Sequence, residues 1–302
     1  LLICLKITRS AAMFLKKRLN FYNRLQIISA IIITTGTLFL LSSSSVYGIS
    51  RSGNPAFYFE KHILWLLLGL VGILLIMKLD TRQIEKHSLP IFLVSLAILP
   101  LPKFFGDLRW IRLGPLSFQP AELVKFTFVL YLADYLKRKL PLIREKKTMW
   151  VPIGFLLLIT GILQLQKDIG TFAVIFFTFM LLMFLAGVRI KNILLIILAG
   201  IVLFTGLILM FPYRRERIMT YLNPAADPMG KGYQTRQSLI AMSSGGILGK
   251  GLGAGERKLK FLPEAHKDYI YAVVGEETGF LGTVFVLSLF GFLVFSSFHL
   301  SN

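Results

Sequence analysis

Cysteine, histidine and acidic residues are all scarce in this 302-residue chain. There is one cysteine, Cys4, which excludes an internal disulfide and any metal cluster built from cysteines. Asp and Glu number 15 against 34 Lys and Arg, so the formal net charge is +19. Only 16% of the residues are charged, whereas 55% are hydrophobic, above the ~45–50% that is typical of soluble domains. The composition therefore favours a membrane protein.

Long apolar runs hold most of the hydrophobic residues. A bilayer core requires about 20 helical residues, with a range of about 17–25, and most of the runs come near that length; 63–77 and 89–102 are the short ones. They lack the alternation of barrel strands, and lipid admits only helices or closed barrels. We therefore expect an all-α polytopic membrane protein with about eight transmembrane helices, at residues 26–47, 63–77, 89–102, 120–136, 149–164, 169–186, 193–211 and 270–298.

The basic residues predict how these helices are oriented. If the N-terminus is cytoplasmic, the inner segments carry 17 Lys and Arg and the short outer segments carry six. The inner segments are 1–25, 78–88, 137–148 and 187–192, and the outer ones are 48–62, 103–119 and 165–168. This bias fixes the orientation by the positive-inside rule. It also accounts for the net charge, so we expect no nucleic-acid partner.

The apolar pattern divides the chain into a cytoplasmic N-terminal segment, residues 1–24, and one transmembrane domain, residues 25–302. A large extracytoplasmic loop, residues 212–269, separates the seventh and eighth predicted helices. A loop of this length is usually functional or disordered. This one contains several aromatic residues and the stretch GYQTRQSLIAMSSGG. We expect it to be ordered, and either re-entrant or amphipathic.

The stretch RWIRLGPLSFQPAELVKF, residues 109–126, suggests an anion site. Pro120 falls where a helix begins, and this helix would point its N-terminus outward. Arg109 and Arg112 precede that N-terminus, an arrangement that suits phosphate. Glu122 and Lys125 share one helix face, as a functional pair within the membrane would. The alternative is a structural ion pair with two arginines that reach the interface.

Two further stretches belong to the predicted outer side. QLQKDIGTF places Asp168 between the fifth and sixth helices, either as a site residue or as an ordinary helix N-cap. SSGGILGKGLGAGERK is rich in glycine, but it fits neither a P-loop nor the dinucleotide fingerprint. We expect its glycines to provide sharp turns and close backbone approach.

The stretch LPEAHKDYIYAVVGEETGFLG, residues 262–282, gathers titratable groups where the last apolar run begins. Glu264, His266 and Asp268 precede the run, and Glu276 and Glu277 lie about two turns into it. A carboxylate here could act as a general base or bind Mg²⁺ or Mn²⁺. The alternative is a set of interfacial acids near a helix N-terminus. Together with Arg109 and Asp168 on the same side, the group suggests a lipid-phosphate substrate.

These stretches also carry a family resemblance. RWIRLGPLSFQPAELVKF, QKDIGTF, RRERIMTYLNPAADPMGKGYQTRQSLIAMSSGGILGKGLGAG and FLPEAHKDYIYAVVGEETGFLG occur in the order and spacing of the SEDS family (shape, elongation, division and sporulation). The chain resembles the FtsW, RodA and SpoVE type of peptidoglycan glycosyltransferase over nearly all of residues 14–281. The RRERI and QSLIAMSSGG segments are more similar to the FtsW branch.

The resemblance implies an enzyme of the bacterial cytoplasmic (inner) membrane. It would polymerise lipid II into β-1,4-linked glycan strands at the outer face, during cell division or elongation. A lipid II hydroxyl would attack the anomeric carbon of an undecaprenyl-linked glycan with inversion, and undecaprenyl pyrophosphate would leave. The implied partners are a class B penicillin-binding protein, which is a transpeptidase, and other division or elongation machinery.

The resemblance also implies roles for single residues. Asp268 would be catalytic, either as the base or as the ligand of a divalent cation, Mg²⁺ or Mn²⁺. Arg109 and Lys125 would neutralise the pyrophosphate, and Glu122 would orient Lys125. The other residues expected to bind substrate are Gln119, Asp168, Gln234, Gln237, His266, Glu276 and Glu277.

The chain departs from the family pattern at several positions. Lys267 replaces the usual threonine between His266 and Asp268, Lys167 replaces a usual proline, and Ala121 replaces a usual serine. The chain also stops after eight predicted helices, where the family has ten, so we expect the last two helices to be missing. Two alternatives therefore accompany the enzyme: a flippase for lipid-linked glycans, and an inactive truncated scaffold that recruits a transpeptidase.

Overall fold

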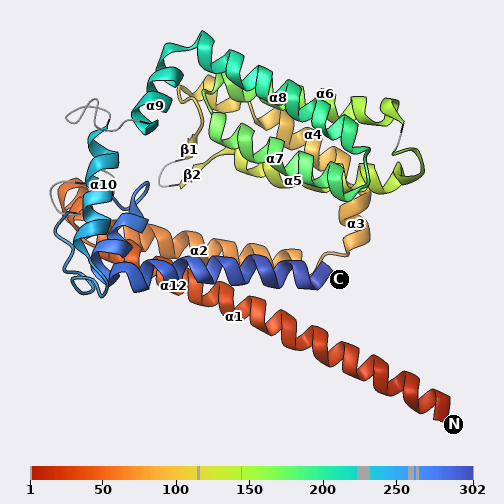
Figure 1. Ribbon diagram of the computed structural model, residues 1–302, viewed down its shortest axis with the longest axis horizontal. Coiled ribbons are helices and arrows are strands. Elements are labelled where there is room, and N and C mark those ends of the chain that lie inside the picture. Colours follow the sequence, from red (N-terminus) through yellow and green to blue (C-terminus); the bar gives the residue numbers. More distant parts are fainter. Residues whose placement is uncertain are drawn as a thin grey trace. The chain divides into compact units, whose positions relative to one another are not determined.

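The structure is a computed structural model that describes residues 2–113, 116–143, 145–222, 232–257, 262 and 265–301. It is built almost entirely of helices (Figure 1). The α-helices are α1 (Leu2–Ser52), α2 (Phe57–Ile76), α3 (Thr81–Lys86), α4 (Ser88–Ile98), α5 (Pro120–Arg138), α6 (Lys146–Leu165), α7 (Ile169–Leu185), α8 (Ile190–Met210), α9 (Pro212–Leu222), α10 (Tyr233–Ser244) and α12 (Ile270–Ser301). Two short 3₁₀ helices are η1 (Leu101–Phe105) and η2 (Leu140–Leu142).

The prediction of an all-α polytopic membrane protein is confirmed. All eight predicted segments lie in helices, and six described helices are long and apolar enough to cross a membrane. These six are Asn23–Ser52, Phe57–Ile76, Ser88–Phe105, Lys147–Leu165, Ile190–Met210 and Ile270–Ser297. Of the other two, α7 is apolar but shorter, and α5 carries charged residues along its length. The count of eight spans stays a prediction.

A small hairpin interrupts the helices and was not foreseen from the sequence. Strand β1 (Ile111–Leu113) pairs antiparallel with β2 (Leu116–Phe118), and Arg112 lies opposite Ser117. The hairpin ends directly before α5, which begins at Pro120 as predicted. Proline is well tolerated at the first helical position because the N–H that it lacks would have no partner there.

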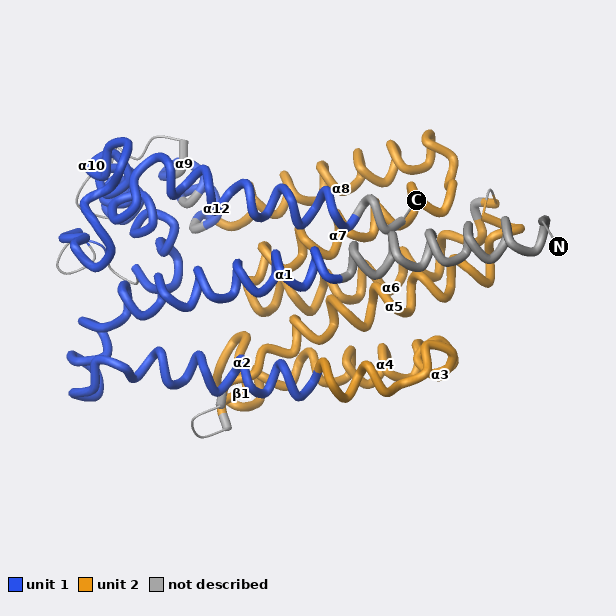
Figure 2. Tube along the Cα trace, turned by 90° about the horizontal axis from the view of Figure 1, so that it is seen from below, with its two compact units in different colours: residues 1–72, 212–302 blue, residues 73–211 orange. Residues whose placement is uncertain are grey.

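The chain separates into two compact units (Figure 2). Unit 1 comprises residues 1–72 and 212–302, and unit 2 comprises residues 73–211. The predicted boundary at residue 24 stays a prediction, and the backbone of α1 continues through it as helix. The predicted loop 212–269 contains two helices, α9 and α10, so a large part of it is ordered as expected.

The core of unit 2 is aromatic and lies between α4, α5, α6 and α7. Phe92 of α4 stacks on Tyr131 of α5 at a centroid distance of 5.0 Å and meets Phe155 of α6 edge-on at 5.1 Å. Phe128 faces Phe179 of α7 at 6.2 Å. Such pairs stabilise a core beyond the area that they bury. Outside this core the side chains of α8 are largely exposed and apolar, as a lipid-facing helix requires.

The centre of unit 1 is the packing of α1 and α10 against α12. Ser43 and Ser44 of α1 are buried, and small residues of this kind let membrane helices approach closely. On the other side, a Cβ atom added to Gly275 would lie only 3.1 Å from the side chain of Met242 in α10. The absence of a side chain at Gly275 therefore allows α10 to pack against α12.

Helix α12 is broken at Gly279, where the backbone has φ 67° and ψ −162°. The glycine-rich segment 245–251 pairs with the break. Lys250 and Gly251 donate backbone N–H groups to the carbonyls of Glu276 and Glu277, each at 3.0 Å. In return, the carbonyls of Gly246 and Ile247 accept from Phe280 and Leu281, at 2.9 and 3.2 Å. The groups that the break removes from the helix ladder are thus satisfied, as an apolar setting demands.

Candidate functional site

In unit 2, Arg109 holds the turn that joins α6 to α7. Its Nε donates to the carbonyl of Gln166 at 3.1 Å, and its Nη2 donates to the carbonyl of Lys167. The same turn has the bonds of a Schellman motif, from Lys167 N to Gln164 O and from Asp168 N to Leu163 O. Lys167 occupies the left-handed position of that motif, with φ 57°. Arg109 therefore fixes the backbone that presents Asp168.

Asp168 is buried and serves as the N-cap of α7. Its Oδ1 accepts from the backbone N–H of Thr171 at 3.2 Å, and its Oδ2 accepts from the Thr171 hydroxyl at 2.9 Å. Gln119, the residue before α5, donates Nε2 to the same Oδ2 at 3.0 Å. The structural alternative for Asp168, a helix cap, is thus realised. The cap is also the point where three predicted site residues, Arg109, Gln119 and Asp168, are joined.

The remaining charges of this site lie nearer the surface. Asp107 accepts the backbone N–H of Arg109 at 3.0 Å and pairs with Arg112 at 3.0 Å. The Arg109 N–H is the main reason why the pKa of Asp107 lies below its usual value. Lys125 and Glu122 form the predicted pair one turn into α5, with Nζ and Oε2 separated by 2.7 Å. The Glu122 side chain is about half exposed, so the pair is not sealed inside the protein.

In unit 1, Asp268 is an exposed residue on a turn two positions before α12 begins. The turn is fixed on its inner side by His266, which is only 5% exposed. The imidazole lies against Tyr47 of α1 and Tyr58 of α2, at centroid distances of 5.0 and 4.4 Å. Tyr47 also donates its hydroxyl to the carbonyl of Leu262 at 2.8 Å. A carboxylate is therefore held at the surface on a rigid support, next to the positive end of a helix.

Glu276 is fully buried and organises the glycine-rich segment. Its Oε1 accepts from Lys250 Nζ at 2.9 Å and from the backbone N–H of Glu256 at 3.1 Å. The backbone N–H of Arg257 lies 3.3 Å from its other oxygen. A buried carboxylate is tolerated only with such partners. In the described structure, Glu276 therefore has a positioning role for the segment that pairs with the α12 break.

Glu277, the next residue after Glu276, is also buried, but it faces α1. The Ser42 hydroxyl of α1 donates to Glu277 Oε1 at 2.7 Å. Gln237 of α10 accepts from Arg257 at 3.1 Å. Gln234 lies half-buried on the same helix, one turn earlier. These three residues belong to unit 1 together with Asp268 and His266. Glu264 lies outside the described residues.

Several residues that contact the predicted site residues are not predicted from the sequence. Ser42, Tyr47 and Tyr58 come from α1 and α2, far from the motifs in sequence, and Lys250 was hidden in the glycine run. The one signal available was the run of four serines at 42–45 within an apolar segment, which marks a face in contact with protein rather than lipid.

The described residues contain no group of three or more His, Cys, Asp or Glu side chains that could hold a metal ion. Asp268 by itself offers one carboxylate. Mg²⁺ commonly keeps several waters and binds one or two carboxylates together with substrate phosphates. Among the described residues, the carboxylate of Asp268 would therefore hold such a cation only together with a phosphate ligand.

Comparison with known proteins identifies the family of this chain. A family model described as "Cell cycle protein", covering FtsW, RodA and SpoVE, matches residues 23–302. The chain is 35% identical to a probable peptidoglycan glycosyltransferase FtsW of Shewanella sediminis, over 94% of this chain and 71% of the relative. It is 36% identical to the protein of the same name from Thiomicrospira cyclica, over 92% of this chain and 73% of the relative.

Solved structures show the same fold. A chain from a study of "polymerization and crosslinking by a peptidoglycan synthase complex" superposes with a TM-score of 0.68 at 28% identity, covering 89% of this chain and 74% of that one. The rod shape determining protein RodA of Thermus thermophilus superposes with a TM-score of 0.59 at 25% identity, covering 89% and 71%. With a family model spanning most of its length and relatives above 30% identity, this chain belongs to the FtsW/RodA/SpoVE family of cell cycle proteins.

Proposed function

We propose that this protein is a peptidoglycan glycosyltransferase that polymerises lipid II into β-1,4-linked glycan strands. The names of its relatives support the reaction class. The observation that carries the proposal is Asp268, an exposed carboxylate on a turn anchored by His266 between two tyrosines. An inverting transfer requires a base for the acceptor hydroxyl, and a rigidly positioned carboxylate is suited to that role.

In the proposed reaction, Asp268 takes the proton of a lipid II sugar hydroxyl as its oxygen attacks the anomeric carbon of the donor. Undecaprenyl pyrophosphate leaves from the opposite face and carries developing negative charge. Arg109 and Lys125 are proposed to neutralise that charge. Arg109 uses Nε and Nη2 for the α6–α7 turn, and a guanidinium has five donors, so donors remain for a phosphate.

The other predicted residues are proposed to support these groups. Glu122 orients the Lys125 ammonium at 2.7 Å, and Gln119 with Asp168 fixes the start of α5 relative to α7. Gln234, Gln237, Glu276 and Glu277 shape the part of unit 1 that precedes and surrounds the α12 break. Their predicted contact with substrate remains a proposal.

We include a divalent cation, Mg²⁺ or Mn²⁺, in this proposal. Asp268 is the residue that would hold it, together with phosphate oxygens of the lipid substrate. When bound, such an ion neutralises phosphate charge. Activity that survives chelation by EDTA would remove the cation from the proposal and leave the base role of Asp268 intact.

We further propose that the protein works in the bacterial cytoplasmic membrane, with its N-terminus in the cytoplasm and the site outside. The partner would be a class B penicillin-binding protein, which crosslinks the glycan, within the division or elongation machinery. The structural relative in a peptidoglycan synthase complex supports a partner of this kind.

The test is polymerisation of labelled lipid II by the purified chain together with its transpeptidase partner and Mg²⁺. Asp268→Asn should lower the rate of glycan formation by about 10²–10⁴-fold, the usual contribution of a general base. The matched control is Asp80→Asn, because Asp80 caps α3 and asparagine caps equally well. The control should polymerise lipid II like the wild type.

Two other results would replace the proposal. Flipping of lipid-linked glycan in vesicles that is unaffected by Asp268→Asn, without polymer, would identify a flippase. Binding of the transpeptidase with neither activity would identify a scaffold. Unchanged polymerisation by Asp268→Asn would keep the enzyme and exclude Asp268 as its base.

A further inference from the structure

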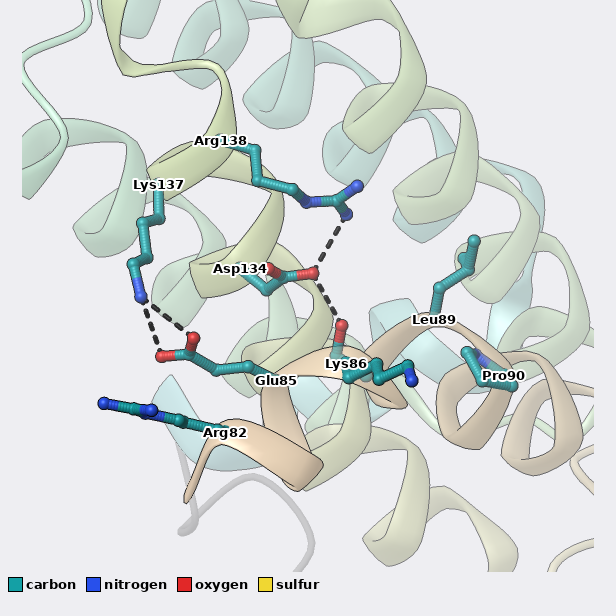
Figure 3. A pocket seen from close by; sticks show the side chains of 9 residues that line it. Arg82, Glu85, Lys86, Leu89, Pro90, Asp134, Lys137 and Arg138 are labelled. Carbon is teal, nitrogen blue, oxygen red and sulfur yellow. Dashed lines mark hydrogen bonds and ion pairs between the residues drawn. The ribbon is translucent and has the colours of Figure 1, made fainter. Parts of the chain in front are cut away.

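A basic pocket lies in unit 2 at the end of α5 opposite to Asp168. It has a volume of about 480 Å³, and four of its lining residues are Arg82 and Lys86 of α3 and Lys137 and Arg138 of α5. Glu85, Ser88, Leu89, Pro90 and Asp134 complete the lining (Figure 3). Lys137 is some 15 residues beyond Glu122 in the same helix, about 20 Å away along its axis. The pocket is therefore separate from Glu122 and Asp168, the unit 2 residues of the proposed site that lie at the other end of α5.

The two carboxylates of the pocket are already engaged. Both oxygens of Glu85 accept from Lys137 Nζ, each at 2.9 Å. Asp134 Oδ2 accepts from Arg138 Nη2 at 2.9 Å and from the Ser88 hydroxyl at 2.7 Å (Figure 3). The side chains of Arg82 and Lys86 have neither a hydrogen bond nor an ion pair within the described part of the chain. Four cations and two carboxylates thus leave the pocket with two positive charges uncompensated.

The pocket continues into an apolar groove between α3 and α5. This groove has a volume of about 310 Å³ and shares Glu85, Ser88, Asp134 and Lys137 with the basic pocket. Beyond these it is lined by Thr81 and Ile84 of α3 and by Leu130 and Ala133 of α5. A cationic pocket joined to an apolar groove matches a molecule with an anionic head and a hydrocarbon tail.

The position of α3 favours a lipid as that molecule. This helix has six residues and connects α2 to α4, both of which belong to predicted membrane spans. Such a connection lies where lipid headgroups are, and basic pockets between transmembrane helices suit anionic headgroups. Exposed basic residues alone would be explained by the positive-inside rule. That rule does not explain why the two carboxylates of the pocket are already paired with lysine and arginine, or why an apolar groove adjoins the pocket.

We propose that the α3–α5 basic pocket binds the phosphate of an anionic phospholipid, with one acyl chain lying in the groove beside Leu130. Arg82 and Lys86 supply the charge for the phosphate. Lys137 pairs with Glu85 and so joins α5 to α3, whereas Arg138 pairs with Asp134 within α5. This site is independent of the polymerisation reaction, so it would survive if the assignment of Asp268 failed.

The test is native mass spectrometry of the full chain released from nanodiscs that contain phosphatidylglycerol and phosphatidylcholine. The wild type should retain one phosphatidylglycerol preferentially. Arg82→Gln with Lys86→Gln should weaken that retention by about 30-fold, because each cation near a membrane surface contributes about 1 kcal/mol. Both side chains are exposed and make no hydrogen bond or ion pair within the described part of the chain, so thermal unfolding should not change.

The matched control is Arg189→Gln with Lys191→Gln, which removes the same charge from exposed positions at the start of α8. This pair should retain phosphatidylglycerol like the wild type. Equal loss in both double variants would overturn the proposal, because it would show attraction by total charge. Unchanged retention in the α3 variant would overturn it too. Displacement of the lipid by millimolar inorganic phosphate would identify a site for free phosphate instead.

Discussion

Lys167 is the residue whose backbone most clearly departs from what the sequence suggests. It adopts φ 57°, the left-handed conformation that glycine favours, at the C-terminal end of α6. A proline is restricted to φ near −65°, and it also lacks the N–H that Lys167 donates to Gln164. A proline here could therefore not close the turn in the same way.

Two substitutions at this position should have opposite effects. Lys167→Gly should raise the free energy of unfolding by about 1 kcal/mol, because it removes the steric cost of the left-handed conformation. Lys167→Pro should lower it by ~3 kcal/mol, because the turn and its contacts with Arg109 are lost. Thermal unfolding in detergent measures both. A stable Lys167→Pro protein would contradict the described turn.

The sequence predicts which residues belong to the site better than it predicts what each of them contacts. Asp168 and Gln119 were both selected, but nothing in the sequence indicates that one caps a helix and also accepts from the other. Glu276 and Glu277 are neighbours in sequence, and the sequence does not distinguish their roles. In the structure one contacts Lys250 and the other contacts Ser42, because consecutive helical side chains point in different directions. Contacts of this kind depend on tertiary packing, which one sequence does not reveal.

Among the elements, α12 carries the least expected feature. The apolar run 270–298 reads as one continuous span, and its glycines do not reveal which of them has a positive φ. Only the paired segment 245–251 explains the break at Gly279, and the two are almost 30 residues apart. The glycine run was expected to provide sharp turns and close approach. The structure has both, with positive φ at Gly246, Gly249, Gly251 and Gly253.

Substitutions in the two paired segments should therefore be equally damaging. Gly279→Ala should lower the free energy of unfolding by ~3 kcal/mol or more, because its φ of 67° is combined with a Cβ only 2.4 Å from Gly249 N. Gly249→Ala, whose Cβ would lie 2.2 Å from the Glu277 carbonyl, should cost a similar amount. Heating in detergent followed by size-exclusion chromatography measures the losses.

The control lies in the same helix. Gly291 has nothing within 4 Å of an added Cβ, and Gly291→Ala should stabilise α12 by up to ~1 kcal/mol. Since Gly279 and Gly249 take part in one contact, the double variant should lose less than the two single losses added together. Additive losses would mean that the break and the loop are stabilised separately.

For the whole molecule, the apolar runs predict where the helices lie, and the basic residues predict how they are oriented in the membrane. All eight predicted segments are helical, because runs of this length have few other ways to satisfy their backbone in lipid. The sequence analysis does not predict the hairpin β1–β2 or helix α9, because neither contains a long apolar run. Helix α10 lies within the stretch GYQTRQSLIAMSSGG, which the sequence predicts to be ordered. The orientation in the membrane follows from charge alone and remains a prediction.

That orientation can be tested by labelling, because Cys4 is the only cysteine. In a Cys4→Ser background, a cysteine at Leu108 should react with an impermeant maleimide in intact cells. A cysteine at Leu140 should react only after the membrane is permeabilised. Both positions are exposed, by 45% and 56%, so accessibility within the protein does not distinguish them. The reverse pattern would invert the proposed topology and place the Asp268 site in the cytoplasm.

The pairing of segment 245–251 with the break in α12 also constrains how the protein is made. The ribosome releases the glycine-rich segment before α12, so the backbone groups of Gly246, Ile247, Lys250 and Gly251 that pair with α12 lack those partners until α12 enters the membrane. The broken helix needs the segment equally, because its own freed backbone groups would otherwise meet lipid. We therefore expect insertion of α12 and closure of the loop to occur as one coupled step. A chain stalled before that step would have Asp268 in its sequence but no support to hold it.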